Sequence, residues 1–213
     1  MSSRQHGHPA VLGRSYMEIE AVAADIRQQL VPGLSAEATL PGLTVFESLN
    51  QNPLSSQGKK VRLDYAVNEL PVDIEALTIY DRAKRRIVLA LSTKTYESLE
   101  REEPRSRFSL FHEVGHAVLH HEELRTLSRQ PSALAIALMR KSVPSHPTYM
   151  DTEWQADAFS AATLMPAKGL YRLEITHGGL NPSIIVATYN VSYQAAETRL
   201  AVYSKNRVDL ICA

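Results

Sequence analysis

Three residues in the segment "RFSLFHEVGHAVLHHEE" (107–123) have the types and the spacing that could hold a metal ion and use it. His112 and His116 are separated by one helical turn, and Glu113 follows the first of them. Four residues of an α-helix advance about 6 Å and rotate about 400°, so both imidazoles face the same point. Glu113, displaced by about 100°, is placed to take a proton from a water molecule at the open position of the ion.

A helix over 104–121 is expected to position these residues. Phe108, Phe111, Val114 and Val118 recur at steps of three and four residues, which gives the helix one apolar stripe. Pro104 suits its first turn, where a missing N–H leaves no hydrogen bond unmade.

A catalytic metal site of this kind usually needs a third protein ligand. His120 lies another 6 Å or so along the helix axis, too far to join a compact site. The extended form of the motif requires glycine at position 119 and histidine at position 122, where this chain has Leu119 and Glu122. We expect His120 and His121 to be structural or to face solvent.

The segment "TEWQADAFSAATLM" (152–165) supplies the third candidate. It is predicted to be a helix that begins with a Thr152–Gln155 capping box and stops at Pro166. Glu153 and Asp157 are one turn apart on one face. Two carboxylates alone usually mark a solvated surface, but the surrounding residues are mostly apolar, which favours an internal site. Glu153 would then be a ligand, and Asp157 would accept the N–H of a ligating imidazole.

Further helices and a β-hairpin are predicted in other segments of the chain. "YMEIEAVAADIRQQL" (16–30) has helical periodicity, and 76–91 is typical of a β-hairpin whose turn includes the charged "DRAKRR". A short helix is expected in the middle of Leu127–Met150. Two helices are expected in 181–205, the first started by Asn181 and Pro182, the second capped by Ser192.

The amino-acid composition favours no particular class of binding partner. Of the 213 residues, 44% are hydrophobic and 22% charged, and 23 Lys+Arg balance 23 Asp+Glu. No bulk charge favours nucleic acid or an acidic membrane. The single cysteine, Cys212, and the absence of a signal peptide or an apolar span predict a cytoplasmic protein. We expect a tail over 1–15, one domain over 16–205 with its core at 77–170 and a helical segment at 181–205, and a tail over 206–213.

The segments "RFSLFHEVGHAVLH", "EWQADAFSAATLMP" and "VSYQAAETRL" resemble the ImmA/IrrE family of metallopeptidases, over about 77–203. The resemblance implies an α+β fold: a mainly helical, zincin-like (gluzincin-like) core, a small antiparallel sheet and a C-terminal helix-turn-helix-like segment. It also implies Zn²⁺ on His112, His116 and Glu153, with Glu113 as general base. Family members are cytoplasmic and cleave helix-turn-helix repressors, which derepresses stress or mobile-element genes. The N-terminal 70 residues and the long 122–150 segment depart from the family pattern.

Several alternatives stay open at this point. "IIVATYNVSYQAAETRL" (184–200) could instead be a DNA-binding helix-turn-helix, although Arg199, Lys205 and Arg207 form a thin basic footprint. A zinc-binding regulator that cleaves nothing is a second alternative. Tyr149, His146 and His177 are candidate donors to a developing oxyanion. The run "RIVLAL" (86–91) could be an edge strand that pairs with substrate or an internal strand.

Overall fold

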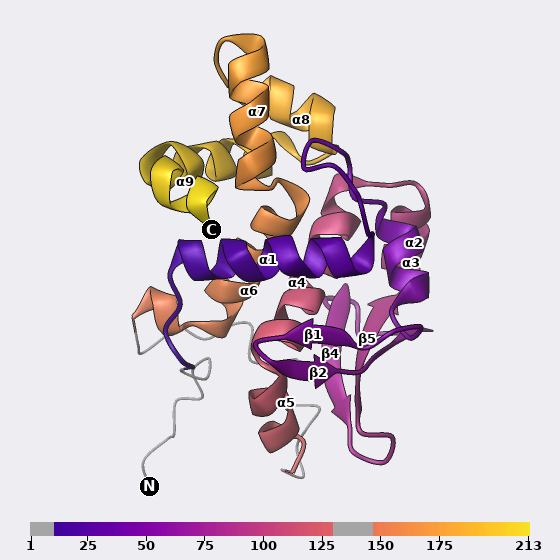
Figure 1. Cartoon of the computed structure of the whole chain (residues 1–213). Helices are drawn as coiled ribbons and strands as arrows, with labels where there is room; N and C mark the ends of the chain where they lie inside the picture. Colours follow the sequence, from indigo (N-terminus) through magenta and orange to yellow (C-terminus); the bar gives the residue numbers. More distant parts are fainter. Residues whose placement is uncertain (1–10, 130–146) are drawn as a thin grey trace, which may run out of the picture.

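The structure, a computed structural model, describes residues 11–129 and 147–213. Helices and two small sheets follow one another as shown in Figure 1. The helices are α1 (Tyr16–Leu30), α2 (Gly42–Ser48), α3 (Thr93–Glu100), α4 (Pro104–Leu119), α5 (His121–Leu127), the 3₁₀ turn η3 (Thr148–Met150), α6 (Thr152–Leu164), α7 (Ala167–His177), α8 (Pro182–Tyr189) and α9 (Tyr193–Cys212). The strands are β1 (Leu54–Ser56), β2 (Lys59–Val61), β3 (Leu63–Asn68), β4 (Ala76–Asp81) and β5 (Arg86–Ser92).

The predicted α+β class is confirmed, with one correction to the sheet. β4 and β5 form the expected antiparallel hairpin, in which Ala76 faces Leu91. β3 pairs in parallel with the other side of β5, so the three-stranded sheet is mixed rather than antiparallel. The edge-strand interpretation of 86–91 is therefore wrong. Its almost continuous apolar run suits a central strand that is covered on both faces, and Leu89 and Leu91 are fully buried.

Helices α4 and α6 pack against each other through a glycine. A Cβ atom added to Gly115 would lie 3.0 Å from the Phe159 ring and 3.2 Å from the Cα atom of Ala156. Ala156 and Phe159 are fully buried. The absence of a side chain at position 115 thus lets the backbone of α6 approach α4 closely.

The two site-bearing helices differ from the sequence prediction at their ends. α4 stops at Leu119, two residues early, and His120 separates it from α5. The Thr152–Gln155 capping box is wrong: the N-cap of α6 is Asp151, whose side chain accepts hydrogen bonds from the backbone N–H groups of Glu153 and Trp154. Asp151 can take this role because it directly follows η3 and has an extended backbone conformation.

The ends of the chain are attached more fully than the sequence predicts. In the segment expected to be a tail over 1–15, the backbone N–H of Val11 donates to the Met150 carbonyl at 3.0 Å. Residues 1–10 and the expected helix in the middle of 127–150 lie outside the described residues. Asn181 and Ser192 cap α8 and α9 as predicted. α9 continues through the expected 206–213 tail to Cys212, with non-helical backbone at Asn206.

A buried ion pair joins α9 to the rest of the molecule. Arg199 Nη2 lies 2.6 Å from Glu20 Oε2 on α1, and the two side chains are only 3% and 6% exposed. Arg199 also donates to the Met165 carbonyl, and Glu20 accepts the backbone N–H of Ala167. One pair of side chains therefore holds α1, the α6–α7 turn and α9 together.

Among the described helices, none has the length and apolar character needed to cross a membrane.

We predict that Glu20→Ala lowers the free energy of unfolding by about 3–5 kcal/mol, because it leaves the Arg199 charge buried without a partner. Adding Arg199→Met should recover part of the loss, since the uncompensated charge is then gone. Urea unfolding of the wild type and both variants measures this. Equal or greater destabilisation in the double variant would contradict it.

Candidate metal centre

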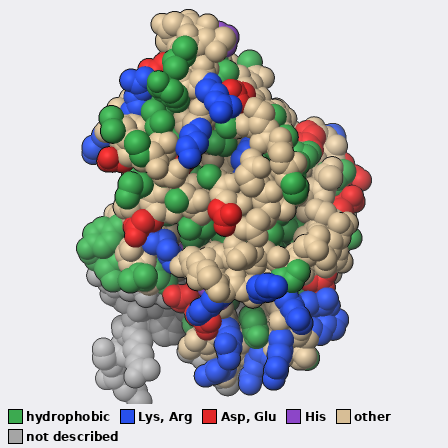
Figure 2. Space-filling view, in the orientation of Figure 1, with side chains coloured by type: hydrophobic (Ala, Val, Ile, Leu, Met, Phe, Trp, Pro, Cys, Tyr) green, Lys and Arg blue, Asp and Glu red, His purple; other side chains and the backbone are tan. Residues whose placement is uncertain are grey.

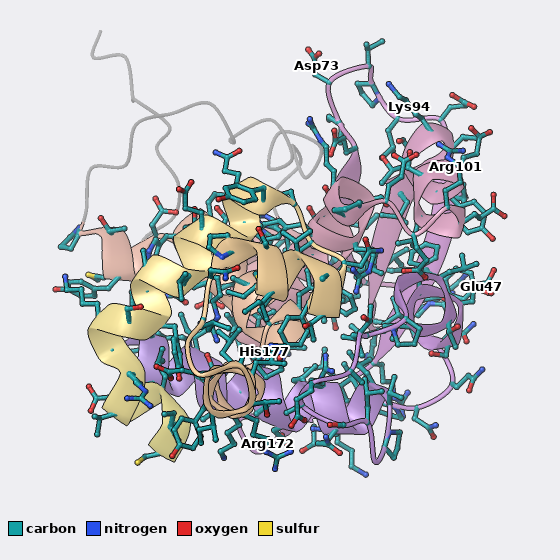
Figure 3. All side chains as sticks on the ribbon, turned by 90° about the horizontal axis from the view of Figure 1, so that it is seen from above. Glu47, Asp73, Lys94, Arg101, Arg172 and His177 are labelled. Carbon is teal, nitrogen blue, oxygen red and sulfur yellow. The ribbon has the colours of Figure 1, made fainter. Side chains whose placement is uncertain are left out.

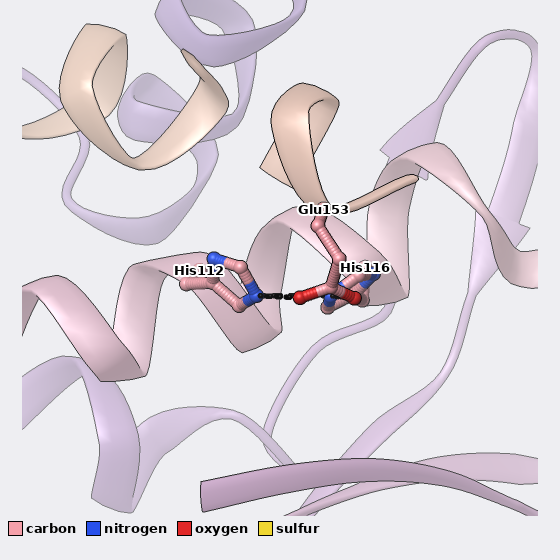
Figure 4. A group of neighbouring side chains, drawn as sticks. All are labelled: His112, His116 and Glu153. Carbon is pink, nitrogen blue, oxygen red and sulfur yellow. Dashed lines mark hydrogen bonds and ion pairs between the residues drawn. The ribbon is translucent and has the colours of Figure 1, made fainter. Parts of the chain in front are cut away.

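The structure brings His112, His116 and Glu153 together from α4 and α6. One ligand atom from each residue lies within 4.8 Å of the others. The two Nε2 atoms are 3.0 Å apart. Glu153 places one carboxylate oxygen 3.4 Å from His112 Nε2 and the other 3.2 Å from His116 Nε2. Figure 4 shows the three side chains pointing toward one another.

These distances fit a metal ion. Ligand atoms about 2.1 Å from a tetrahedral ion lie about 3.4 Å from each other, close to the 3.0, 3.2 and 3.4 Å separations here. Two imidazoles and one carboxylate are also a donor set found in catalytic zinc sites. The residues present therefore fit a catalytic metal ion with one open position.

The electrostatics of the cluster favour a cation. Burial disfavours a charged His112, but hydrogen bonds to the Asp157 and Glu153 carboxylates raise its pKa to about 10. Burial likewise disfavours the Glu153 carboxylate, yet hydrogen bonds from His112 and His116 hold its pKa well below the usual range. In the absence of metal, a proton on His112 takes the place of the cation.

Asp157 orients His112 as the spacing predicts. Its carboxylate oxygen lies 2.7 Å from His112 Nδ1. Because a carboxylate accepts, His112 carries a proton on Nδ1. Nε2 faces the cluster, and its lone pair would be available to a metal ion once the imidazolium loses its second proton.

A second device, which the sequence analysis did not predict, orients His116. The Gln155 amide donates to the carbonyls of Leu12 and Tyr149, at 2.9 and 2.8 Å. Its oxygen therefore faces His120 Nε2, 3.1 Å away. His120 in turn places its Nδ1 atom 3.1 Å from His116 Nδ1. His120 is only 2% exposed, so it does not face solvent.

The relay runs from Gln155 through His120 to His116, and its donor and acceptor roles follow from the Gln155 end. Burial and the nearby His116 lower the pKa of His120 to about 3, so its ring is neutral. The Gln155 oxygen accepts, which places the proton of His120 on Nε2 and leaves its Nδ1 as an acceptor. His116 must then donate from Nδ1. The Nε2 lone pair of His116 is left for the metal.

Glu113 is held beside the ligands by the sheet. It is 1% exposed. The Thr78 hydroxyl on β4 lies 2.7 Å from Glu113 Oε2 and 3.1 Å from the Glu113 carbonyl. The structure thus fixes the predicted general base with a hydroxyl that sequence periodicity could not single out.

The structure describes two of the three candidate oxyanion donors. Tyr149 is in η3, where it is 53% exposed and packs against Gly13. His177 is the last residue of α7, which extends away from α4 (Figures 1 and 3). His146 lies outside the described residues.

The profile of the peptidase family M78, described as the IrrE N-terminal-like domain, matches residues 80–201. That span contains both ligand helices and extends into α9. The chain therefore belongs to the IrrE/ImmA family of metallopeptidases. The comparison with curated proteins found no match.

We predict that His120→Phe weakens zinc binding about 10- to 100-fold, because His116 loses the acceptor that fixes its tautomer. Competition with a chromophoric chelator measures the affinity. His121→Ala, at the neighbouring histidine, serves as the control and should leave the affinity unchanged.

The tautomers themselves can be read from the ring-nitrogen shifts of the ¹⁵N-histidine-labelled wild type without metal. The relay requires His120 protonated at Nε2 and His116 at Nδ1. A proton on Nδ1 of His120 would show that the relay runs in the other direction.

Proposed function

We propose that this chain is a zinc-dependent endopeptidase that cleaves a helix-turn-helix transcriptional repressor in the cytoplasm. The convergence of His112, His116 and Glu153 beside the buried Glu113 carries the peptidase part of the proposal. Family membership supports it. The repressor as substrate is supported by the sequence resemblance alone.

The residues divide the chemistry between them. His112, His116 and Glu153 would hold Zn²⁺, which supplies a Lewis acid that polarises the scissile carbonyl and lowers the pKa of water. The Glu113 carboxylate takes the proton of the attacking water and later returns it to the leaving amine. The Thr78 hydroxyl, bonded to Glu113 Oε2, restricts that carboxylate to one orientation.

β4 is the strand best placed to receive an extended substrate. It lies at an edge of the three-stranded sheet, because β5 is its only neighbour among the described strands. It also runs beside α4, to which Thr78 connects it. A peptide that adds to this edge through backbone hydrogen bonds would pass directly over the metal ligands.

The DNA-binding alternative receives less support from the structure. Arg199 is buried against Glu20. Arg207 is paired with Glu174. Exposed basic residues gather elsewhere, over β2 and the β4–β5 turn (Figure 2), and include Lys59, Lys60, Arg62, Lys84 and Arg85. The recognition face that α9 would need is therefore poor in free positive charge.

Incubation of the zinc-loaded protein with the product of a neighbouring repressor-like gene tests the substrate. We expect one or two defined fragments, and mass spectrometry locates the cut. An intact repressor, together with cleavage of an unrelated protein, would retain the peptidase and reject the repressor.

We predict that Glu113→Gln retains stoichiometric zinc but lowers kcat by at least about 10²-fold, since proton transfer is lost while the ligands stay in place. Metal analysis and fragment formation measure the two effects. If the variant cleaved as fast as the wild type, Glu113 would not be the general base. If cleavage were lost but a phenotype dependent on the protein were unchanged, the non-proteolytic alternative would gain support.

We predict that Thr78→Val lowers kcat about 10-fold or more with little change in KM, because one hydrogen bond to the charged base is removed at constant shape. Thr78→Ser, which keeps the hydroxyl, should restore most of the rate. Steady-state kinetics of the two variants provide the check. Equal rates for Val and Ser would assign Thr78 a packing role only.

A further inference from the structure

A groove beside the metal centre is left without a role by the chemistry above. Its volume is about 710 Å³, and it lies between the partly buried faces of α4, α6 and α9. Apolar side chains make up most of its lining, among them Phe108, Trp154, Ala158, Ala161, Ala195 and Val202. The residues from α6 and α9 recur at helical spacing, so each helix presents one face to the groove.

The groove adjoins the metal centre at Asp157. Asp157 lines it and also binds His112 Nδ1 at 2.7 Å. Phe108 precedes His112 by one turn on α4, and the carbonyl of Phe108 accepts the Ser160 hydroxyl of α6 at 3.0 Å. The groove thus adjoins His112 through Asp157 and follows the contact between α4 and α6 toward the start of α4.

The charges around the groove are already neutralised. Arg199 is occupied by Glu20. At the other side, Glu75 accepts from Ser109 and pairs with Arg105 at 2.6 Å. A charged side chain that entered would find no unpaired partner of opposite sign among these groups and would lose its hydration. An apolar side chain would gain from burial.

We propose that this groove is the subsite that receives a bulky apolar side chain of the peptide substrate, close to the bond that is cut. α9, in the helix-turn-helix-like segment, forms its outer wall and sets which side chains enter. The inference rests on the proposed endopeptidase function and adds the substrate preference. The volume is within the range of about 300–1,000 Å³ that is usual for ligand pockets, enough for an aromatic or leucine side chain with some adjoining backbone.

Trp154 makes this proposal measurable without catalysis, because it lines the groove and is the only tryptophan of the chain. The zinc-loaded full chain is titrated with N-acetyl-phenylalanine methylamide and, separately, with N-acetyl-alanine methylamide. We expect a saturable change in tryptophan emission with the first probe. The second should bind at least about 10-fold more weakly, because it buries less apolar surface.

Two variants block the groove in different ways. Ala161→Leu fills it from α6, and Thr198→Phe narrows it from an exposed position on α9, where a larger side chain leaves the core intact. Both should abolish the response to the phenylalanine probe. Ala201→Leu, at an exposed α9 position outside the groove, is the matched control and should keep it. Equal binding of the two probes, or a response that survives both blocking variants, overturns the proposal.

Cleavage data separate this proposal from the function on which it rests. Wild-type cuts mapped in unfolded casein should lie beside bulky apolar residues, and Thr198→Phe should raise KM for those sites more than it lowers kcat. Cuts without this preference overturn the subsite alone. Selective probe binding in a zinc-loaded protein that cleaves neither casein nor any repressor overturns the endopeptidase, and the subsite with it.

Discussion

The close approach of α4 and α6 at Gly115 is the constraint on which the metal centre depends. Two of the candidate ligands are on α4 and the third is on α6, so the distance between the helices determines whether three donors can share one ion. A Cβ atom at position 115 would lie 3.2 Å from the Cα atom of Ala156, which is backbone and cannot turn aside. A larger residue at position 115 would therefore require the two helices to move apart by a few tenths of an ångström, which would change the separation of the candidate ligands.

The two histidine ligands are oriented by different physical means. His112 relies on a carboxylate, Asp157, whose side chain is 61% exposed. His116 relies on a neutral, buried relay through His120 and Gln155. A charged partner raises the basicity of the imidazole and attracts the cation, whereas the neutral relay adds no charge. Both imidazoles are thus oriented, and His116 needs no further carboxylate inside the centre.

Much of this could be predicted from sequence, because local periodicity determines α1, the β4–β5 hairpin and the helical spacing of His112, Glu113 and His116. Glu153 and Asp157 could also be found, since two carboxylates interrupt an otherwise apolar helix. The place of β5 in the sheet could not, because it depends on pairing with the distant β3. Nor could the roles of Thr78 and Gln155, whose partners include residues far away along the chain. His120 is one turn from His116, but its role depends on Gln155, which belongs to another helix.

The hydrogen bonds of Gln155 have a consequence for two segments of the chain, the first of which lies outside the matched 80–201 span. Its amide is held by the Leu12 carbonyl, from a segment nearly at the start of the chain, and by the Tyr149 carbonyl, just ahead of α6. Both carbonyls belong to backbone and carry no side-chain identity. The sequence of these two segments can therefore change as long as the backbone keeps its path. A shift of the backbone would move Gln155 and, through the rings of His120 and His116, would change the direction of the His116 Nε2 lone pair. The Leu12 backbone thus acts as a mechanical support for a candidate metal ligand through Gln155 and His120.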